Sequence, residues 1–170
     1  MVAFQIRELN GIDRAWVARL LEERWGSTRI VTRGRIHHAE TLPGFVAAQE
    51  DKRIGLLTYC IEGEECEIVS LNSLVERIGV GSALIAAAKN TAVSAHCKRL
   101  WLITTNDNLA AMRFYQKRGF VLVAVHRNAL AESRRLKPEI PLIGIDDIPL
   151  RDEIELEMEL VCEQSTGMGS

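Results

Sequence analysis

The sequence has few of the residues that build metal sites or disulfide frameworks. Its 170 residues include only four cysteines and four histidines. The cysteines, at positions 60, 66, 97 and 162, show no Cys-x-x-Cys spacing, and the histidines form no His-Glu-x-x-His pattern. We therefore expect buried or half-buried free thiols and no metal ion.

Long apolar runs and an excess of positive charge are also lacking. No segment approaches the roughly 20 apolar residues of a membrane span, and residues 1–8 do not resemble a signal peptide. The formal net charge of -2 gives no global reason to expect binding to nucleic-acid phosphates. We expect a soluble cytoplasmic protein that binds neither membrane nor nucleic acid.

The first half of the sequence predicts mainly strands, because apolar and polar residues alternate in short runs bounded by polar turns. These strands are expected at residues 4–8, 44–49, 54–61 and 66–71. An amphipathic helix is expected at 15–25, with Asp13 as its N-cap and Gly26 at its end. Residues 30–38 are expected to be extended around Gly34.

The second half alternates helices with strands. Helices are expected at residues 79–95, 108–118 and 129–135, and strands at 99–104, 120–126 and 154–160. Three of the four prolines lie in a long irregular connection that ends at Arg151. With 47% hydrophobic residues, the chain is expected to form one domain over residues 1–163 and a disordered tail at 164–170.

Residues 76–84 form a first motif, Glu-Arg-Ile-Gly-Val-Gly-Ser-Ala-Leu. A glycine turn that leads from a strand into a helix brings backbone N–H groups and the positive end of the helix dipole to a phosphate group. Gly79 and Gly81 allow the backbone to approach closely, and Ser82 adds a hydroxyl donor. Alternatively, the two glycines only begin a helix that packs tightly on a sheet.

Residues 108–120 form a second motif, Asn-x-x-Ala-x-x-Phe-Tyr-x-x-x-Gly-Phe. In this order the two motifs resemble those of the GCN5-related N-acetyltransferases (GNAT), in particular small uncharacterised bacterial members. The resemblance implies a single α/β (α+β) domain. Its central sheet would be mixed, mostly antiparallel, flanked by helices and splayed at a cleft for acetyl-CoA.

The resemblance assigns the cosubstrate acetyl-CoA to backbone and side-chain groups of both motifs. Asn108 is expected near the pantetheine or phosphate region, unless it serves only as the N-cap of its helix. Main-chain groups of the strand end would hold pantetheine, and those of the glycine turn would hold the pyrophosphate. These groups belong to Leu71, Asn72, Ser73, Leu74, Arg77, Ile78, Gly79, Val80, Gly81 and Ser82.

The glycine motif departs from the family pattern at its start. Glu76 stands where the family has Arg or Gln, and Arg77 stands at a place often held by glycine. A carboxylate beside a pyrophosphate is unfavourable. We therefore expect Glu76 to point to solvent and Arg77 to supply the positive charge.

The resemblance implies direct acetyl transfer to a primary amine in a ternary complex. Tyr115 would protonate the leaving thiolate, and the Leu71 N–H would polarise the thioester carbonyl. Glu67 would be the base, directly or through water. As alternatives, Tyr115 is a core aromatic residue and Glu67 is a solvent-facing strand carboxylate.

The acceptor, a small-molecule or peptide amine, is not identified by the sequence. Specificity in this fold normally comes from the first helices and the connection before the last strand. Candidate positions are Trp16, Trp25, His37, His38, Glu139, Asp146 and Asp147, while Glu62, Glu64 and Glu65 either form a solvated turn or attract a cationic acceptor. A catalytically silent acyl-CoA-binding or regulatory module is the alternative function. An exposed final strand would either pair in a homodimer or stay an edge.

Overall fold

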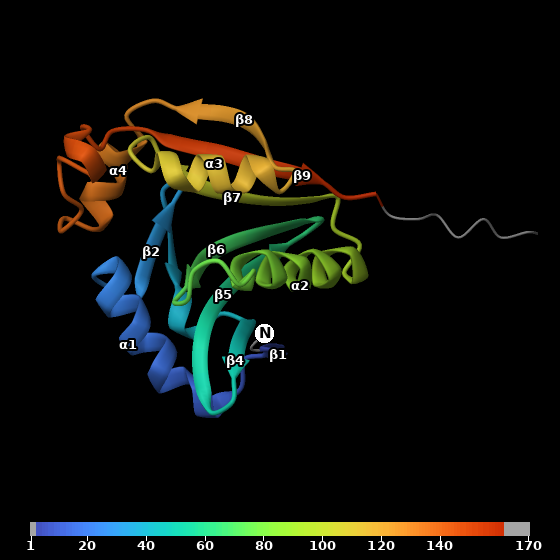
Figure 1. The fold of residues 1–170 in the computed structure, drawn as a ribbon. Helices are drawn as coiled ribbons and strands as arrows, with labels where there is room; N and C mark the ends of the chain where they lie inside the picture. The colour runs from blue at the N-terminus through green and yellow to red at the C-terminus, as the bar shows by residue number, and fades with distance from the viewer. Residues whose placement is uncertain (1–2, 162–170) are drawn as a thin grey trace, which may run out of the picture.

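The computed structural model describes residues 3–161 (Figure 1). The expected tail at 164–170, the domain end at 163 and Cys162 lie outside these residues. Cys60, Cys66 and Cys97 are free thiols, as expected: Cys66 and Cys97 are buried, and Cys60 is half-buried. Burial raises the pKa of the Cys66 thiol to about 12, so this thiol stays protonated at neutral pH.

Seven strands form one sheet in the order β1-β4-β5-β6-β7-β9-β8, and β2 forms a separate hairpin with β3 (Figure 1). All neighbouring strands of the large sheet are antiparallel except β6 and β7. The expected mixed, mostly antiparallel sheet is confirmed. The strands are β1 (Gln5–Glu8), β2 (Arg29–Thr32), β3 (Arg35–His38), β4 (Gly44–Gln49), β5 (Lys52–Glu62), β6 (Glu65–Ser73), β7 (Arg99–Thr105), β8 (Val121–His126) and β9 (Glu153–Glu159).

The expected helices are present, and each of their ends lies within one residue of its expected position. They are α1 (Arg14–Trp25), α2 (Val80–Ser94), α3 (Leu109–Lys117) and α4 (Ala129–Leu136). Gly26 ends α1 in a left-handed conformation with φ of 75°, which glycine adopts without strain. Within residues 3–161, every helix is too short or too polar to cross a membrane.

Two hydrophobic clusters cover opposite faces of the sheet. Leu56 of β5 packs with Val17 and Leu21 of α1, whereas its neighbour Leu57 packs with Leu84 of α2. Successive side chains of a strand point to opposite faces, so α1 and α2 cover different sides of β5. The sheet is therefore enclosed on both sides where β5 and β6 cross the molecule.

The parallel strands β6 and β7 pair over only part of their length. Their register runs from Glu65 opposite Arg99 to Ile68 opposite Leu102. Beyond this point β6 continues to Ser73 and β7 to Thr105 without pairing to each other. A shift in the β5–β6 register between Thr58 and Tyr59 leaves one extra residue in β6, and such bulges bend a strand. The sheet therefore opens between β6 and β7.

The final strand is not an edge, so the expectation of an exposed last strand was wrong. β9 lies between β7 and β8 and pairs with both. The alternation of Ile154, Leu156 and Met158 with glutamates indicated a strand with one wet face but contained no information on which strands lie beside it. The edges of the large sheet are β1 and β8.

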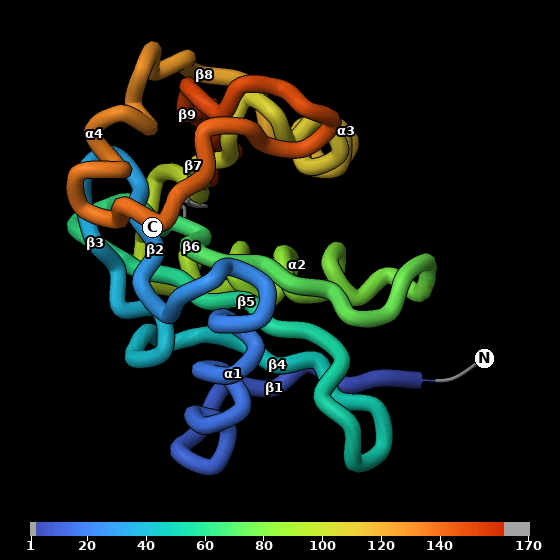
Figure 2. The backbone as a smooth tube through the Cα atoms, turned by 90° about the vertical axis from the view of Figure 1, so that its left-hand side faces the viewer, coloured from blue at the N-terminus to red at the C-terminus, as the bar shows by residue number. Residues whose placement is uncertain are grey.

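The connection between α4 and β9 is held against the rest of the molecule by buried polar contacts. Lys137 Nζ donates to the carbonyls of Trp25 and Arg29 at 3.2 and 3.0 Å, which ties the end of α4 to the chain after α1. Glu153 is buried and accepts hydrogen bonds from the Arg33 backbone and the Ser133 hydroxyl. Figure 2 shows α4 beside the β2–β3 hairpin, as these contacts require.

Asp13 stands at the N-cap position of α1 as expected, but its side chain makes no cap hydrogen bond to the helix. Its fully buried carboxylate instead accepts hydrogen bonds from Arg7 of β1 at 2.7 and 2.9 Å and from Arg53 of β5 at 2.8 Å. The Asn10 N–H donates to it as well, at 3.0 Å. These guanidinium and backbone contacts outweigh a cap bond and hold the pKa of Asp13 well below its usual range.

Candidate active site

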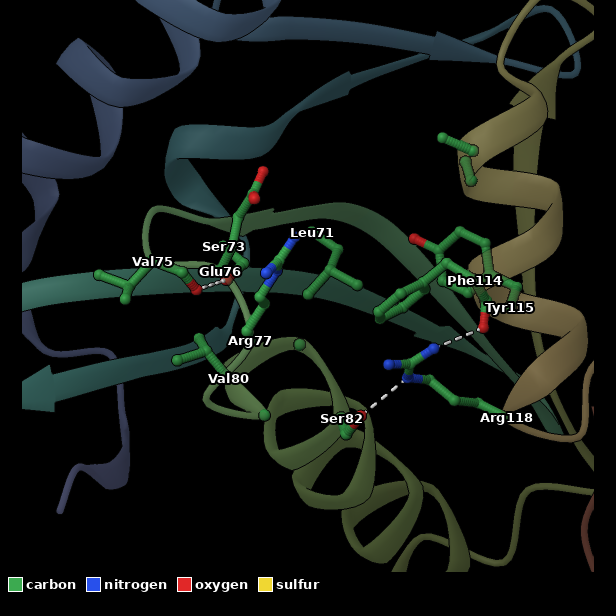
Figure 3. Close-up of a pocket in the computed structure, with 14 residues that line it drawn as sticks. Leu71, Ser73, Val75, Glu76, Arg77, Val80, Ser82, Phe114, Tyr115 and Arg118 are labelled. Carbon is green, nitrogen blue, oxygen red and sulfur yellow. Dashed lines mark hydrogen bonds between the residues drawn. The ribbon is translucent and has the colours of Figure 1, made fainter. Parts of the chain in front are cut away.

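A first cavity of about 560 Å³ opens where β6, the start of α2 and α3 meet (Figure 3). α2 begins after Gly79, which has a φ of 86°, and no side chain caps the helix. The first backbone N–H groups of a helix have no partner within the helix, so this uncapped start can bind an anion. Gly79, Val80, Gly81 and Ser82, expected at a phosphate site, all line the cavity.

Glycine at position 81 is also required by the packing of α2 against α3. A Cβ atom at this position would lie 2.8 Å from Cζ of Phe114, closer than atoms of folded proteins approach. The glycine therefore allows the two helices to meet. The alternative interpretation of the glycine motif, tight helix packing, thus holds for Gly81 alongside its place in the cavity wall.

Arg118 is a cavity residue that the sequence analysis missed. Its Nε donates to Ser82 Oγ at 2.7 Å, its Nη1 donates to the Phe114 carbonyl at 2.8 Å, and its guanidinium lies 3.5 Å from the centroid of the Phe114 ring. Figure 3 shows the side chain reaching from α3 to α2. The sequence placed it only among the unspecified residues between Tyr115 and Gly119, and its role depends on the meeting of two helices.

The departures from the family pattern also lie at this cavity. Glu76 and Arg77 are exposed residues of the loop before α2, and both line the cavity. Arg77 has a φ of 67°, which is uncommon for a residue with a side chain. The structure therefore brings two cations, Arg77 and Arg118, and one carboxylate to the same cavity.

A second cavity of about 340 Å³ lies on the other side of the opening between β6 and β7. Its walls come from the end of α1, from β6, β7 and α3. It shares Leu71, Ala111 and Tyr115 with the first cavity. Two ligands, one in each cavity, would therefore meet at these residues.

Tyr115 stands at this junction in an apolar environment. Its ring packs edge-on against Phe114 at 5.2 Å and Phe120 at 5.5 Å between centroids. Burial raises the pKa of its hydroxyl well above the usual range, so the phenol keeps its proton at neutral pH. The side chain is thus part of the core packing and also faces both cavities.

The open edge of β6 offers a limited set of backbone groups. The Leu74 N–H donates to the Ile54 carbonyl at 2.8 Å and so points toward β5. Backbone groups alternate in direction along a strand, so Asn72 also faces β5, whereas Leu71 and Ser73 face the opening. Asn108 lines the second cavity, and its side chain accepts a hydrogen bond from the Ala111 N–H at 3.1 Å as the N-cap of α3.

Glu67 lies beneath the β2–β3 hairpin and lines neither of the two cavities that meet at Tyr115, although it lines a small cavity of about 20 Å³. It is 5% exposed and accepts a hydrogen bond from Thr32 Oγ1 at 2.6 Å. His37 Nε2 lies 3.3 Å from the same carboxylate and 2.9 Å from Thr32 Oγ1. The Glu67 side chain is therefore buried, and the alternative of a solvent-facing carboxylate was wrong. The next residue of β6, Ile68, lines the second cavity.

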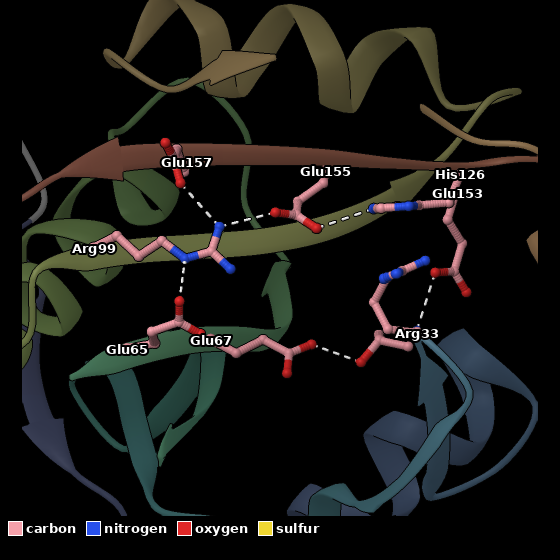
Figure 4. A network of polar contacts seen from close by, with 9 residues as sticks. Arg33, Glu65, Glu67, Arg99, His126, Glu153, Glu155 and Glu157 are labelled. Carbon is pink, nitrogen blue, oxygen red and sulfur yellow. Dashed lines mark hydrogen bonds and ion pairs between the residues drawn. The ribbon is translucent and has the colours of Figure 1, made fainter. Parts of the chain in front are cut away.

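The other expected acidic residues of this region form ion pairs. Glu62 pairs with Arg35 and Glu64 with Lys98. Figure 4 shows Arg99 joining Glu65 to Glu155 and Glu157 across three strands, at 2.8 to 2.9 Å. No group of three or more Cys, His, Asp or Glu residues suited to a metal ion lies within residues 3–161.

Of the candidate acceptor residues, only Trp25 lines the second cavity. Its Nε1 donates to Asn72 Oδ1 at 3.2 Å. Trp16 lies under the Arg53 guanidinium, His37 is buried with Glu67, and His38 is exposed. Glu139 lies 3.8 Å from Arg29, and Asp146 and Asp147 are exposed away from the cavity lining.

Comparisons with known proteins give a consistent result. Residues 12–120 match the Acetyltransferase (GNAT) family. The chain is 43% identical over 146 residues to the uncharacterized protein YdhI of Bacillus subtilis, a match that covers 85% of this chain and 91% of that protein.

The solved structures that share the fold include two acetyltransferases from Bacillus species. An IAA acetyltransferase from Bacillus cereus has a TM-score of 0.68 and 20% identity, with 93% of this chain and 100% of that chain covered. A Bacillus subtilis acetyltransferase in complex with CoA has a TM-score of 0.66 and 17% identity, with 95% and 100% covered.

Proposed function

Because the chain belongs to the Acetyltransferase (GNAT) family, and is an acyltransferase on that ground, we propose that it transfers acetyl from acetyl-CoA directly to a primary amine. The observation that carries the proposal is the junction of two cavities at Leu71 and Tyr115. One cavity has the features of a phosphate site and the other has room for an acceptor. A solved structure of similar fold has CoA bound.

The residues of the first cavity fit acetyl-CoA by their chemistry. The uncapped start of α2 and the fixed Arg118 guanidinium suit a pyrophosphate, and the open edge of β6 suits the amides of pantetheine. Acetyl-CoA supplies an activated acetyl thioester. The Leu71 N–H, which faces the opening, is assigned to the thioester carbonyl oxygen and stabilises the negative charge that develops there.

In the proposed reaction an N–C bond forms between the amine and the acetyl carbon, and the C–S bond breaks. The amine nitrogen loses a proton, and the departing sulfur gains one. Tyr115 is assigned as the acid that protonates the sulfur, because it holds its proton at neutral pH. Glu67 is assigned as the base that accepts the amine proton through water, because it lies on β6, the strand that lines the acceptor cavity from Ile68 to Asn72.

Calorimetric titration with acetyl-CoA, CoA and ATP in one buffer tests this proposal. Stoichiometric binding of acetyl-CoA without binding of ATP supports it and leads to an amine screen that follows thiol release. Binding without turnover of any amine would instead support the silent acyl-CoA-binding module. Failure to bind acetyl-CoA would exclude both.

Arg118→Ala is expected to weaken acetyl-CoA binding by about tenfold, or about 1.4 kcal/mol. The loss follows from removing a cation that Ser82 and the Phe114 carbonyl hold at the phosphate site. Titration calorimetry measures it. Arg113→Ala is the matched control, since Arg113 is an exposed arginine of α3 outside the cavity lining. Equal effects of both variants would mean that only net charge matters.

Glu67→Gln is expected to lower kcat/KM by about 100-fold at low pH, where the amine is mainly protonated and depends on a base. The deficit should shrink as pH rises and the free amine becomes abundant. A pH series of thiol release measures the ratio to wild type. Glu65→Gln, a carboxylate change on the same strand, should leave the ratio near one. A Glu67→Gln ratio that is constant with pH would contradict the role as base.

A further inference from the structure

The second cavity has one basic lining residue and no acidic one. Of its lining residues only Arg24 is charged, and no Asp or Glu is among them. Arg24 is exposed in the last turn of α1 and has no ion-pair or hydrogen-bond partner within residues 3–161. A site that selected polycationic amines would need carboxylates here.

The backbone that carries Arg24 is fixed in place. The neighbouring Trp25 donates its indole N–H to Asn72 Oδ1 of β6 at 3.2 Å, and its carbonyl accepts from Lys137 Nζ at 3.2 Å. Gly26 then ends the helix. The end of α1 is therefore held against both β6 and the segment after α4, so Arg24 extends from a rigid wall of the cavity.

Asn72 adds an unpaired donor to the same wall. An indole N–H can only donate, so the Asn72 oxygen must face Trp25 and its amide nitrogen must face away. That nitrogen is buried and has no hydrogen-bond partner. A buried donor without a partner is costly, and on the open part of the same wall Arg24 pairs best with acceptor oxygens that carry negative charge.

We propose that the acceptor is a small amine that also carries an anionic group, and that Arg24 binds this group while the amine lies at the Leu71–Tyr115 junction. An α-amino acid is the simplest molecule with this arrangement, and a cavity of about 340 Å³ suits a small molecule. The inference rests on the proposed acetyl transfer and deepens it by naming the substrate class.

Arg24 also has a structural role that the test must separate. A cation in the last turn of a helix stabilises it through the helix dipole. Arg24→Lys keeps this interaction but loses the two parallel N–H donors that bind a carboxylate. Arg24→Gln removes both, and Arg19→Gln removes the same charge from an exposed position of α1 outside the cavity.

The experiment measures kcat/KM by thiol release for matched amines with the wild-type enzyme and each variant. The probes are the proteinogenic L-amino acids, the amide of each preferred one and the corresponding decarboxylated amine. Phosphoethanolamine and ethanolamine distinguish a phosphate from a carboxylate as the anion. The ratio of variant to wild type for each probe cancels the different basicities of the amines.

We expect Arg24→Gln to raise KM by at least tenfold for the preferred amine that carries an anionic group. KM for the counterparts that lack this group should change by less than about twofold. Arg24→Lys should lie between, Arg24→Glu should reverse the preference, and Arg19→Gln should have no effect. Thermal melts establish that each variant is folded. An Arg24→Gln effect on KM that is equal for amines with and without an anionic group would overturn the inference. A wild-type preference for amines without this group would overturn it as well.

Failure of this inference differs from failure of the proposed function. If acetyl-CoA binds but no anionic amine of the panel releases thiol, the inference is overturned and the cofactor assignment stands. If acetyl-CoA does not bind at all, both the proposed function and the inference that rests on it fall.

Discussion

Tyr115→Phe is expected to lower turnover by about 100-fold while changing acetyl-CoA affinity by less than about twofold. The substitution removes only the hydroxyl, and the ring contacts with Phe114 and Phe120 remain. The hydroxyl has no hydrogen-bond partner within residues 3–161, so its loss leaves no buried polar group unpaired. The variant should therefore fold and bind normally but lack a proton donor for the departing thiolate.

Steady-state thiol release and acetyl-CoA titration together measure this effect. Tyr59→Phe provides the control, because Tyr59 of β5 stacks on Phe45 at 5.9 Å and lines neither of the two cavities that meet at Tyr115. It loses the same hydroxyl away from the junction and should retain wild-type turnover. Wild-type turnover by Tyr115→Phe would remove the tyrosine as the acid and leave it as a core aromatic residue.

Asp13→Asn is expected to lower the free energy of unfolding by about 2 kcal/mol at pH 7. The substitution leaves Arg7 and Arg53 without the carboxylate that they share. Removing one partner of a fully buried pair costs more, but Arg7 and Arg53 are 41% and 29% exposed, so water partly replaces the lost contact. Urea denaturation of both proteins measures the difference.

The same carboxylate makes this difference depend on pH. The pKa of Asp13 is lowered by folding, so its contribution is complete above the unfolded value of about 4 and is lost as pH falls below that value. The difference in free energy of unfolding between wild type and Asp13→Asn should therefore be smaller at pH 3 than at pH 7. Asp51→Asn, at the exposed β4–β5 turn, should leave stability nearly unchanged at both pH values. A difference that stays constant would mean that Asp13 acts by shape and not by charge.

Local signals predicted much of the fold. Gly26 ends α1, Asn108 caps α3 and the alternation at residues 154–160 marks β9. The GNAT family, expected from two motifs, is confirmed by the match over residues 12–120. Each of these features depends on a few consecutive residues, whose conformation is set by backbone preferences and hydrophobic period.

Contacts between distant segments could not be predicted in this way. Asp13 fits the pattern of an N-cap, and only the packing of β1 beside β4 and β5 brings Arg7 and Arg53 to it. Arg118 and Arg24 resemble ordinary surface cations of helix ends until the helices are placed around the opening of the sheet. Their place in the cavity walls is a property of the tertiary structure.

The central position of β9 has a consequence for biosynthesis. β8 pairs only with β9, and β7 pairs with β9 along its whole length. The ribosome synthesises β7 and β8 before residues 153–159. The half of the sheet next to Tyr115 therefore cannot form until its central strand, β9, has been synthesised. The half formed by β1, β4, β5 and β6 has all its antiparallel neighbours by residue 73. A nascent chain stalled between these two points would hold an assembled sheet of β1, β4, β5 and β6, while the cavity wall that carries Tyr115 would still lack its supporting strand.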